Sequence, residues 1–203
     1  MSKKIVILAN SRKLSGRCVA GKDEYGNWIR LTKNGHNPIP ISEAINYGML
    51  KVLQVEGIIS RPSRQFNYHS ENANYTRATS INDLDIETVD RLLDHPEDIF
   101  GTGKQVAELE VQNLNESLLL VEVSDFTIYV KNGGQYPDKL RGKFTYNGTM
   151  YSDIAVTDSF VEGRLSTCRS PYQETYETAY ITISLGEIFN GYAYKLISGV
   201  IIP

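Results

Sequence analysis

The stretch KKIVILANSRK, residues 3–13, is followed at once by SGRCVAG, residues 15–21, and together they indicate how the chain folds. Its five consecutive apolar residues (IVILA) predict a strand that is buried on both faces of its sheet. That strand runs directly into a turn carrying Arg12, Lys13 and Arg17. Cationic side chains held at a rigid strand end are suited to binding an anion such as a phosphate or a carboxylate. The opening therefore predicts a binding surface.

The composition is that of one large or two small globular domains. Of the 203 residues, 41% are hydrophobic and 22% are charged, and 13 tyrosines with 16 glycines and 7 prolines favour many strands joined by tight turns. The formal net charge is −3, so no general field attracts polyanions to the surface. Any contact with nucleic acid therefore has to be local.

The cysteines and the start of the chain indicate a compartment. Cys18 and Cys168 have no partner at metal-ligand spacing, which predicts free, buried thiols in a reducing environment. The N-terminus lacks an extended apolar leader with a cleavage site, and no apolar run reaches the length of a membrane span. We therefore expect a cytoplasmic protein without membrane contact.

Apolar and alternating runs predict strands through most of the chain. An Asn-Gly pair at 147–148 between two such runs is the strongest hairpin signal. The apolar spacing predicts a single helix over 81–95, ended by Pro96. The segments with the clearest strand character are 5–9, 17–22, 28–32, 49–59, 118–123, 126–130, 139–146, 150–156, 179–185 and 192–202.

One helix among about nine strands does not give the alternation of a parallel, doubly wound sheet. We therefore predict a mainly β fold with two OB-like antiparallel β-barrel subdomains and one inserted helix. The first subdomain would span residues 1–113, including the helix at 81–95, and the second would span residues 114–203. Barrels of this type bind oligonucleotides or oligosaccharides on one face.

A cationic residue of the third predicted strand extends the candidate site. Residues 28–32 alternate so that Arg30 points to the side opposite the aliphatic residues. It is then either a solvated arginine or joins Arg12 and Arg17 beside Trp28, whose ring would stack on a base.

The second half of the chain carries possible counterparts. Arg141 and Lys143 share one face of the predicted hairpin, and Lys195 lies on the last strand. Cations there would neutralise phosphates bound by the second barrel.

Two further motifs are weak. His69 and Glu71 resemble a fragment of a catalytic or metal site, but no further ligand stands at metal-ligand spacing. The GTGK segment at 101–104 lacks the full spacing of a phosphate-binding loop and is interpreted as a turn. We therefore expect neither a metal nor a cofactor.

Several segments resemble a known family, the prokaryotic dual OB-containing domain family. The similar segments are 7–13 (ILANSRK), 16–21 (GRCVAG), 28–30 (WIR), 146–148 leading to Tyr151, 156–158 (VTD), 184–187 (SLGE) and 194–197 (YKLI). The likeness covers almost the whole chain, although Leu31 stands where the family often has proline. It implies two OB-like barrels that recognise nucleic acid or a nucleotide, in prokaryotic conflict or defence settings. It implies no catalytic mechanism.

The leading hypothesis is a binding module for single-stranded nucleic acid or a nucleotide-like ligand, with a protein partner also possible. One alternative is an enzyme acting on nucleic acid through Asp158, His69 and Glu71, although turn chemistry favours Asp158 as the cap of a turn. Another is a protein-interaction scaffold that uses the tyrosines. The candidate ligand-binding residues are Asn10, Ser11, Arg12, Lys13, Arg17, Trp28, Arg30, Arg141, Lys143, Asp158 and Lys195.

Overall fold

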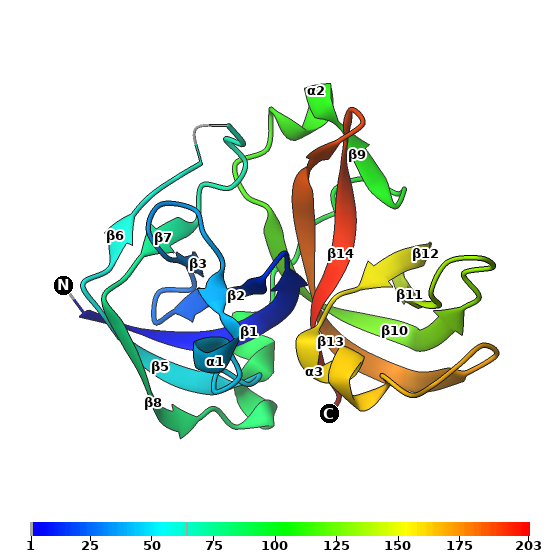
Figure 1. The fold of residues 1–203 in the computed structure, drawn as a ribbon, viewed down its shortest axis with the longest axis horizontal. Helices are drawn as coiled ribbons and strands as arrows, with labels where there is room; N and C mark the ends of the chain where they lie inside the picture. The colour runs from blue at the N-terminus through cyan, green and yellow to red at the C-terminus, as the bar shows by residue number, and fades with distance from the viewer. Residues whose placement is uncertain (1, 64) are drawn as a thin grey trace.

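The computed structural model describes residues 2–63 and 65–203, which form two β-sheets side by side (Figure 1). One sheet is a closed five-stranded barrel and the other is a sheet that curls on itself. The prediction of a mainly β fold with two OB-like subdomains is confirmed. Met1, the first residue of the expected 1–113 unit, lies outside the described residues, as does Arg64.

The N-terminal sheet follows the order β6-β7-β3-β2-β1-β5-β8, and β4 pairs with β2. Only residues 75–76 separate β7 from β8, so β7, which is second in the sheet path, and β8, which is last, act as one bent fifth strand. Its first part pairs in parallel with β3, and its second part pairs with β5. The elements are β1 (Ser2–Lys13), β2 (Gly16–Asp23), β3 (Trp28–Thr32), β4 (Ile39–Pro40), α1 (Ile41–Ala44), β5 (Lys51–Glu56), β6 (Ile59–Ser60), β7 (Asn72–Asn74) and β8 (Arg77–Asp83).

The C-terminal sheet follows the order β12-β11-β10-β13-β14 and is closed by parallel pairing of β12 with β14. With α3 between the third and fourth strands, this is the connectivity of an OB barrel. The short strand β9 extends the sheet at β14. The elements are β9 (Gln105–Ala107), α2 (Glu108–Val111), β10 (Leu118–Lys131), β11 (Lys139–Tyr146), β12 (Thr149–Val156), α3 (Ser159–Arg164), β13 (Gln173–Phe189) and β14 (Tyr192–Ile201).

The hairpin predicted at 147–148 is confirmed. Asn147 and Gly148 connect β11 to β12, and their φ angles are 46° and 74°. Positive φ at both central residues is the geometry that matches the twist of paired strands, and asparagine and glycine adopt it readily.

The prediction of a helix over residues 81–95 is wrong. Residues 77–83 form β8, which is hydrogen-bonded to β5, and only Ile86–Leu92 is helical, as a 3-10 helix capped by Asp85. Pairing with the free edge of β5 satisfies the backbone groups of this segment more fully than a helix start would. Of the expected apolar stripe only Val89 is fully buried, while Ile81 is 47% exposed.

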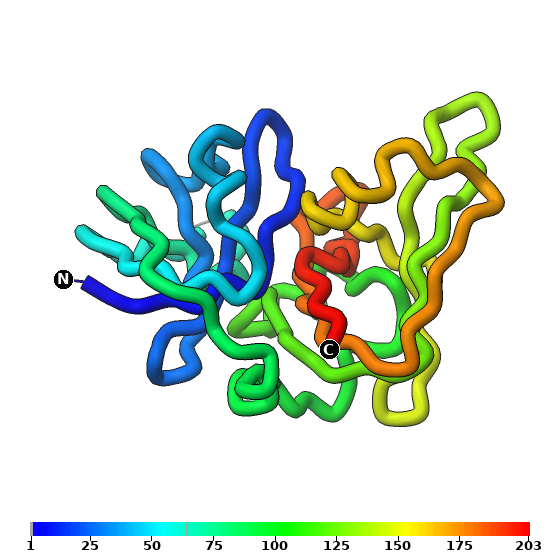
Figure 2. Tube along the Cα trace, turned by 90° about the horizontal axis from the view of Figure 1, so that it is seen from below, coloured from blue at the N-terminus to red at the C-terminus, as the bar shows by residue number. Residues whose placement is uncertain are grey.

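Strand β1 serves both barrels. The C-terminal part of β1, drawn in blue, lies beside the second sheet (Figures 1 and 2). Ile5 and Ile7 fill the core of the N-terminal sheet, whereas Leu8 packs against Leu120 and Ile201 of the second barrel. The expected burial on both faces is confirmed, because the outer face of β1 lies against the neighbouring barrel.

Hydrogen bonds fix this contact. The Thr182 hydroxyl donates to the carbonyl of Leu8 at 2.5 Å, and the Arg12 amide donates to the carbonyl of Thr157 at 2.9 Å. Each bond joins one barrel directly to the other, so the junction is ordered at the level of the backbone.

Two expectations about the whole chain can be compared with the structure. Cys18 and Cys168 are free thiols, as predicted, but each is half-buried and not fully buried. Within the described residues, no helix combines the length and the apolar character needed to cross a membrane.

Candidate ligand-binding site

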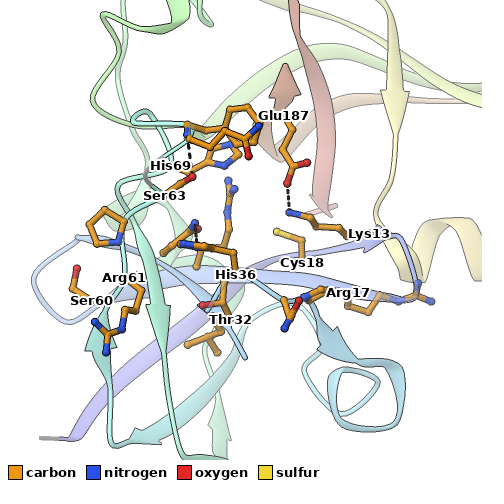
Figure 3. A pocket seen from close by; sticks show the side chains of 18 residues that line it. Lys13, Arg17, Cys18, Thr32, His36, Ser60, Arg61, Ser63, His69 and Glu187 are labelled. Atoms are coloured by element: carbon orange, nitrogen blue, oxygen red, sulfur yellow. Dashed lines mark hydrogen bonds and ion pairs between the residues drawn. The ribbon is translucent and has the colours of Figure 1, made fainter. Parts of the chain in front are cut away.

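A cavity of about 550 Å³ opens on the N-terminal barrel, over β2 and β3 and under the connection between β5 and β7. We call it the first-barrel cavity. In OB barrels the outer face of the second and third strands, together with the loop between the fourth and fifth, is the usual ligand-binding surface. Here β2, β3 and residues 57–63 and 65–71 occupy those positions. The residues that line it include Lys13, Arg17, Cys18, Arg30, Thr32, His36, Arg61, Ser63, Phe66, His69, Asn72 and Glu187 (Figure 3).

Arg30 lies at the base of this cavity in a buried ion pair. Its Nη2 is 2.9 Å from Oε1 of Glu71 and 2.8 Å from the hydroxyl of Ser117. Burial acts to lower the pKa of Arg30, but Glu71 and other ionisable groups outweigh it, so the pKa is raised and the charge is retained. The sequence correctly predicted that Arg30 faces away from the aliphatic core, but its side chain is 5% exposed and not solvated.

Three polar atoms of this cluster have no hydrogen-bond partner among the described residues. They are Nε of Arg30, Oε2 of Glu71 and Oδ1 of Asn72. Arg30 and Asn72 also line the cavity, and parallel pairing of β3 with β7 places them side by side. Unpaired buried donors and acceptors are costly, and in folded proteins they are concentrated where a ligand or a water is bound.

His69 forms part of the wall as a neutral imidazole. Burial, followed by the charge of Arg30, lowers the pKa of His69 to about 3. Its Nε2 is 3.2 Å from the carbonyl of Leu185, which can only accept, so Nε2 carries the proton and Nδ1 is an acceptor. The neighbouring Tyr68 donates to the carbonyl of Gly186 at 2.8 Å. The His69–Glu71 motif thus helps to dock residues 57–71 on β13, in addition to lining the cavity.

The accessible cations of the cavity come from different segments. Arg17 on β2 and Arg61 after β6 form no ion pair among the described residues. Lys13 is 2.8 Å from Glu187 of β13, and the two side chains are 28% and 51% exposed. This ion pair joins the barrels at the cavity, whereas Arg61 lies on the opposite side (Figure 3).

Lys13, Arg17 and Arg30 line this cavity together, whereas Arg12 and Trp28, which the sequence predicted to lie with them, do not. The indole of Trp28 donates to Asp94 at 3.1 Å and packs between the barrels, away from the cavity. Its ring also lies under the ammonium group of Lys22. The aromatic groups that do line the cavity are Phe66 and two histidines.

Asn10, Ser11 and Asp158 are buried at the junction of the barrels. The side-chain amide of Asn10 donates to the carbonyls of Ala44 and Tyr47, at 2.8 and 2.9 Å. Asp158 pairs with Ser11 in an isolated bridge, and its carboxylate caps α3 and accepts from the amide of Val200. Burial raises the pKa of Asp158 despite these hydrogen bonds. These three residues hold the fold together and do not line the first-barrel cavity.

The expected second-half cations are separated. Arg141 lies 3.3 Å from Asp153 and lines a second cavity, together with Arg12. Lys143 is exposed and lines neither cavity. Lys195 is buried, donates to the carbonyl of Gly101, and has its pKa lowered to about 8 by burial. It is part of the barrel wall.

Sequence reasoning missed His36, Arg61, Phe66 and Asn72. All four lie in polar connections or in the very short strand β7, where no hydrophobic period indicates a direction. A signal in the sequence that could have pointed to this site is the presence of a cation, Arg61, and an aromatic residue, Phe66, in the loop between the fourth and fifth strands of the barrel. No group of three or more His, Cys, Asp and Glu side chains within residues 2–63 and 65–203 is arranged to hold a metal ion.

A family model described as the dual OB-containing domain matches residues 3–200, nearly the whole chain. No curated protein matches the sequence.

Proposed function

The chain belongs to the dual OB-containing domain family, and from that premise we propose that it is a binding module for single-stranded nucleic acid or a nucleotide, with the first-barrel cavity as its site. The observation that carries the proposal is the position of this cavity. The cavity lies over the strands that bind ligands in an OB barrel, and three cations line it: Lys13, Arg17 and Arg61. Among the described residues Arg17 and Arg61 form no ion pair, and the pair between Lys13 and Glu187 is exposed and therefore weak.

The chemistry of the lining supports a ligand with both phosphate and base. Arg17 and Arg61 supply donors for phosphate oxygens, and the Phe66 ring is a stacking surface. Nδ1 of neutral His69 and Oδ1 of Asn72 are acceptors for the exocyclic amine of a base. Because the net charge of the chain is −3, this local cluster would favour a short contact over tight, non-specific coating of long polymers.

The catalytic alternative has less support. Both oxygens of the Asp158 carboxylate accept backbone hydrogen bonds, from Phe160 and Val161 at the start of α3 and from Val200. Asp158 does not line the cavity that contains His69, and Glu71 forms a buried ion pair with Arg30. These three groups therefore do not converge on one reacting atom.

The scaffold alternative also has less support. Tyr47, Tyr68, Tyr75 and Tyr151 are buried and serve the cores and their polar contacts. They cannot contribute to an exposed interface in this conformation. The exposed Tyr25, Tyr136 and Tyr192 come from three different parts of the chain, namely the β2–β3 turn, the β10–β11 connection and the start of β14.

The test is fluorescence anisotropy with labelled DNA and RNA oligomers, and competition by free nucleotides, at two salt concentrations. We expect binding at low salt that weakens as salt rises, and at least a ten-fold loss in an Arg17→Ala/Arg61→Ala variant. A Lys4→Ala/Arg77→Ala variant removes the same charge from exposed positions outside the cavity and serves as the matched control. Equal losses in both variants, or no binding at low salt, would overturn the proposal.

A further inference from the structure

A second cavity, of about 850 Å³, lies on the C-terminal barrel over β11 and β12, beside α3. We call it the second-barrel cavity. It is also lined by the connection 132–138 between β10 and β11. In an OB barrel these are the second and third strands and the loop between the first and second, again the surface that binds ligands. Both barrels thus have a cavity on the equivalent face.

The second-barrel cavity is cationic. Its lining includes Arg12, Lys139, Arg141 and Arg169, against the carboxylates of Asp138 and Glu162. Lys139 and Arg169 are exposed and form no ion pair among the residues that the structure describes. Neither side chain has to lose a carboxylate in order to bind phosphate. Nη1 of Arg169 donates to the carbonyls of Ser166 and Cys168, at 3.1 and 2.9 Å, which holds the guanidinium at the cavity.

A third hollow, of about 250 Å³, lies at the junction of the barrels and is lined by residues of both. It shares Lys13, Arg30 and Glu187 with the first-barrel cavity, and it shares Arg12 with the second-barrel cavity. Consecutive residues of a strand point to opposite faces. The end of β1 therefore directs Lys13 toward one cavity and Arg12 toward the other.

Positive charge is concentrated along these three hollows. Among the described residues, their linings contain eight of the chain's 21 lysines and arginines but only three of its 24 acidic residues. The side chain of Arg12 is 62% exposed in its ion pair with Glu162, and the Lys13–Glu187 pair is also exposed. Exposed ion pairs contribute little stability, so a phosphate can replace either carboxylate at low cost.

We propose that one single strand of nucleic acid runs across both barrels, with successive phosphates in the first-barrel and second-barrel cavities and the Arg12–Lys13 pair at the crossing. This inference rests on the proposed function of the first-barrel cavity and defines its ligand as a polymer. A free nucleotide would occupy only one cavity. Because hydrogen bonds to the backbone of β1 fix this strand to the second barrel, the two binding surfaces are held in one relative position and binding does not have to align them.

The experiment compares tetramers and dodecamers of thymidylate and uridylate in binding to the full chain. More binding registers alone make a dodecamer about ten-fold tighter than a tetramer, so a strand that contacts both cavities should exceed this and approach 100-fold. In a Lys139→Ala/Arg169→Ala variant, we expect the dodecamer to lose about ten-fold while the tetramer changes less than two-fold. The slope of log K against log salt for the dodecamer should become shallower by about 1.4, the value for two lost phosphate contacts.

A Lys4→Ala/Arg77→Ala variant is the matched control, because both residues are exposed, lie outside all three hollows and carry the same charge. It should bind both oligomers nearly as the native chain does. If the tetramer binds but Lys139→Ala/Arg169→Ala leaves dodecamer affinity unchanged, the shared strand is overturned and the first-barrel site stands. If neither oligomer nor a free nucleotide binds at low salt, both proposals are overturned.

Discussion

The carbonyl oxygen of Leu8 occupies the space that a side chain on Gly199 would need: a Cβ at this position would come within 2.0 Å of it. Leu8 belongs to β1 and Gly199 to β14, so this contact lies between the two barrels. Only glycine allows the two backbones to approach so closely.

Gly199→Ala should therefore destabilise the protein. The clash is with a backbone atom that cannot move without separating the barrels, and we expect a loss of about 1–3 kcal/mol in the free energy of unfolding, measured by urea denaturation. Gly163→Ala is the control, because Gly163 lies in α3 and a methyl group there would have nothing within 4 Å. It should be neutral or slightly stabilising. Equal effects of the two substitutions would contradict a tight junction.

The buried Arg30–Glu71 pair should behave as a unit. Arg30→Met leaves an unpaired carboxylate in the base of the cavity, which should cost about 3–5 kcal/mol in the free energy of unfolding. Glu71→Gln leaves an unpaired guanidinium and should also be destabilising. In the double variant both charges are gone, so its loss should be well below the sum of the single losses. Additive losses in urea denaturation would show that the pair is not coupled.

His69 should make the protein acid-sensitive. Its pKa is about 3 in the folded chain and 6.5 in the unfolded chain, so the unfolded state gains a proton first as the pH falls. Stability is unaffected by this group above pH 6.5 and falls between pH 6.5 and 3. We expect the native chain to lose on the order of 1–2 kcal/mol more than a His69→Gln variant between about pH 6 and pH 4.5. Parallel pH profiles of the two proteins would contradict a buried, neutral imidazole.

Glu187 should compete with the ligand for Lys13. Glu187→Gln releases the ammonium group and removes a negative charge from the cavity, so oligonucleotide affinity at low salt should rise about three- to ten-fold. Glu122→Gln, at an exposed position on β10, makes the same charge change away from the first-barrel cavity and should have little effect. An equal gain in both variants would indicate a general effect of net charge.

Local sequence signals predicted most of the strands because they depend on neighbours in the chain. The continuous apolar run of β1 and the Asn147–Gly148 turn each specify their own backbone. The helix prediction over 81–95 failed for the complementary reason. The hydrogen bonds that make β8 a strand come from the free edge of β5, a segment earlier in the chain that a local pattern does not reveal.

The sequence by itself determined two features: the two-barrel architecture and the cluster of cations at the end of β1. Both follow from strand period, turn chemistry and charge, which are properties of adjacent residues. Only the tertiary structure decided which of those cations are accessible. Arg30 is held by Glu71 and Ser117, 41 and 87 positions away, while Arg17 and Arg61 meet across a cavity formed by separate segments. The physical reason is that burial and charge pairing depend on distance in space, which the folding of each sheet sets.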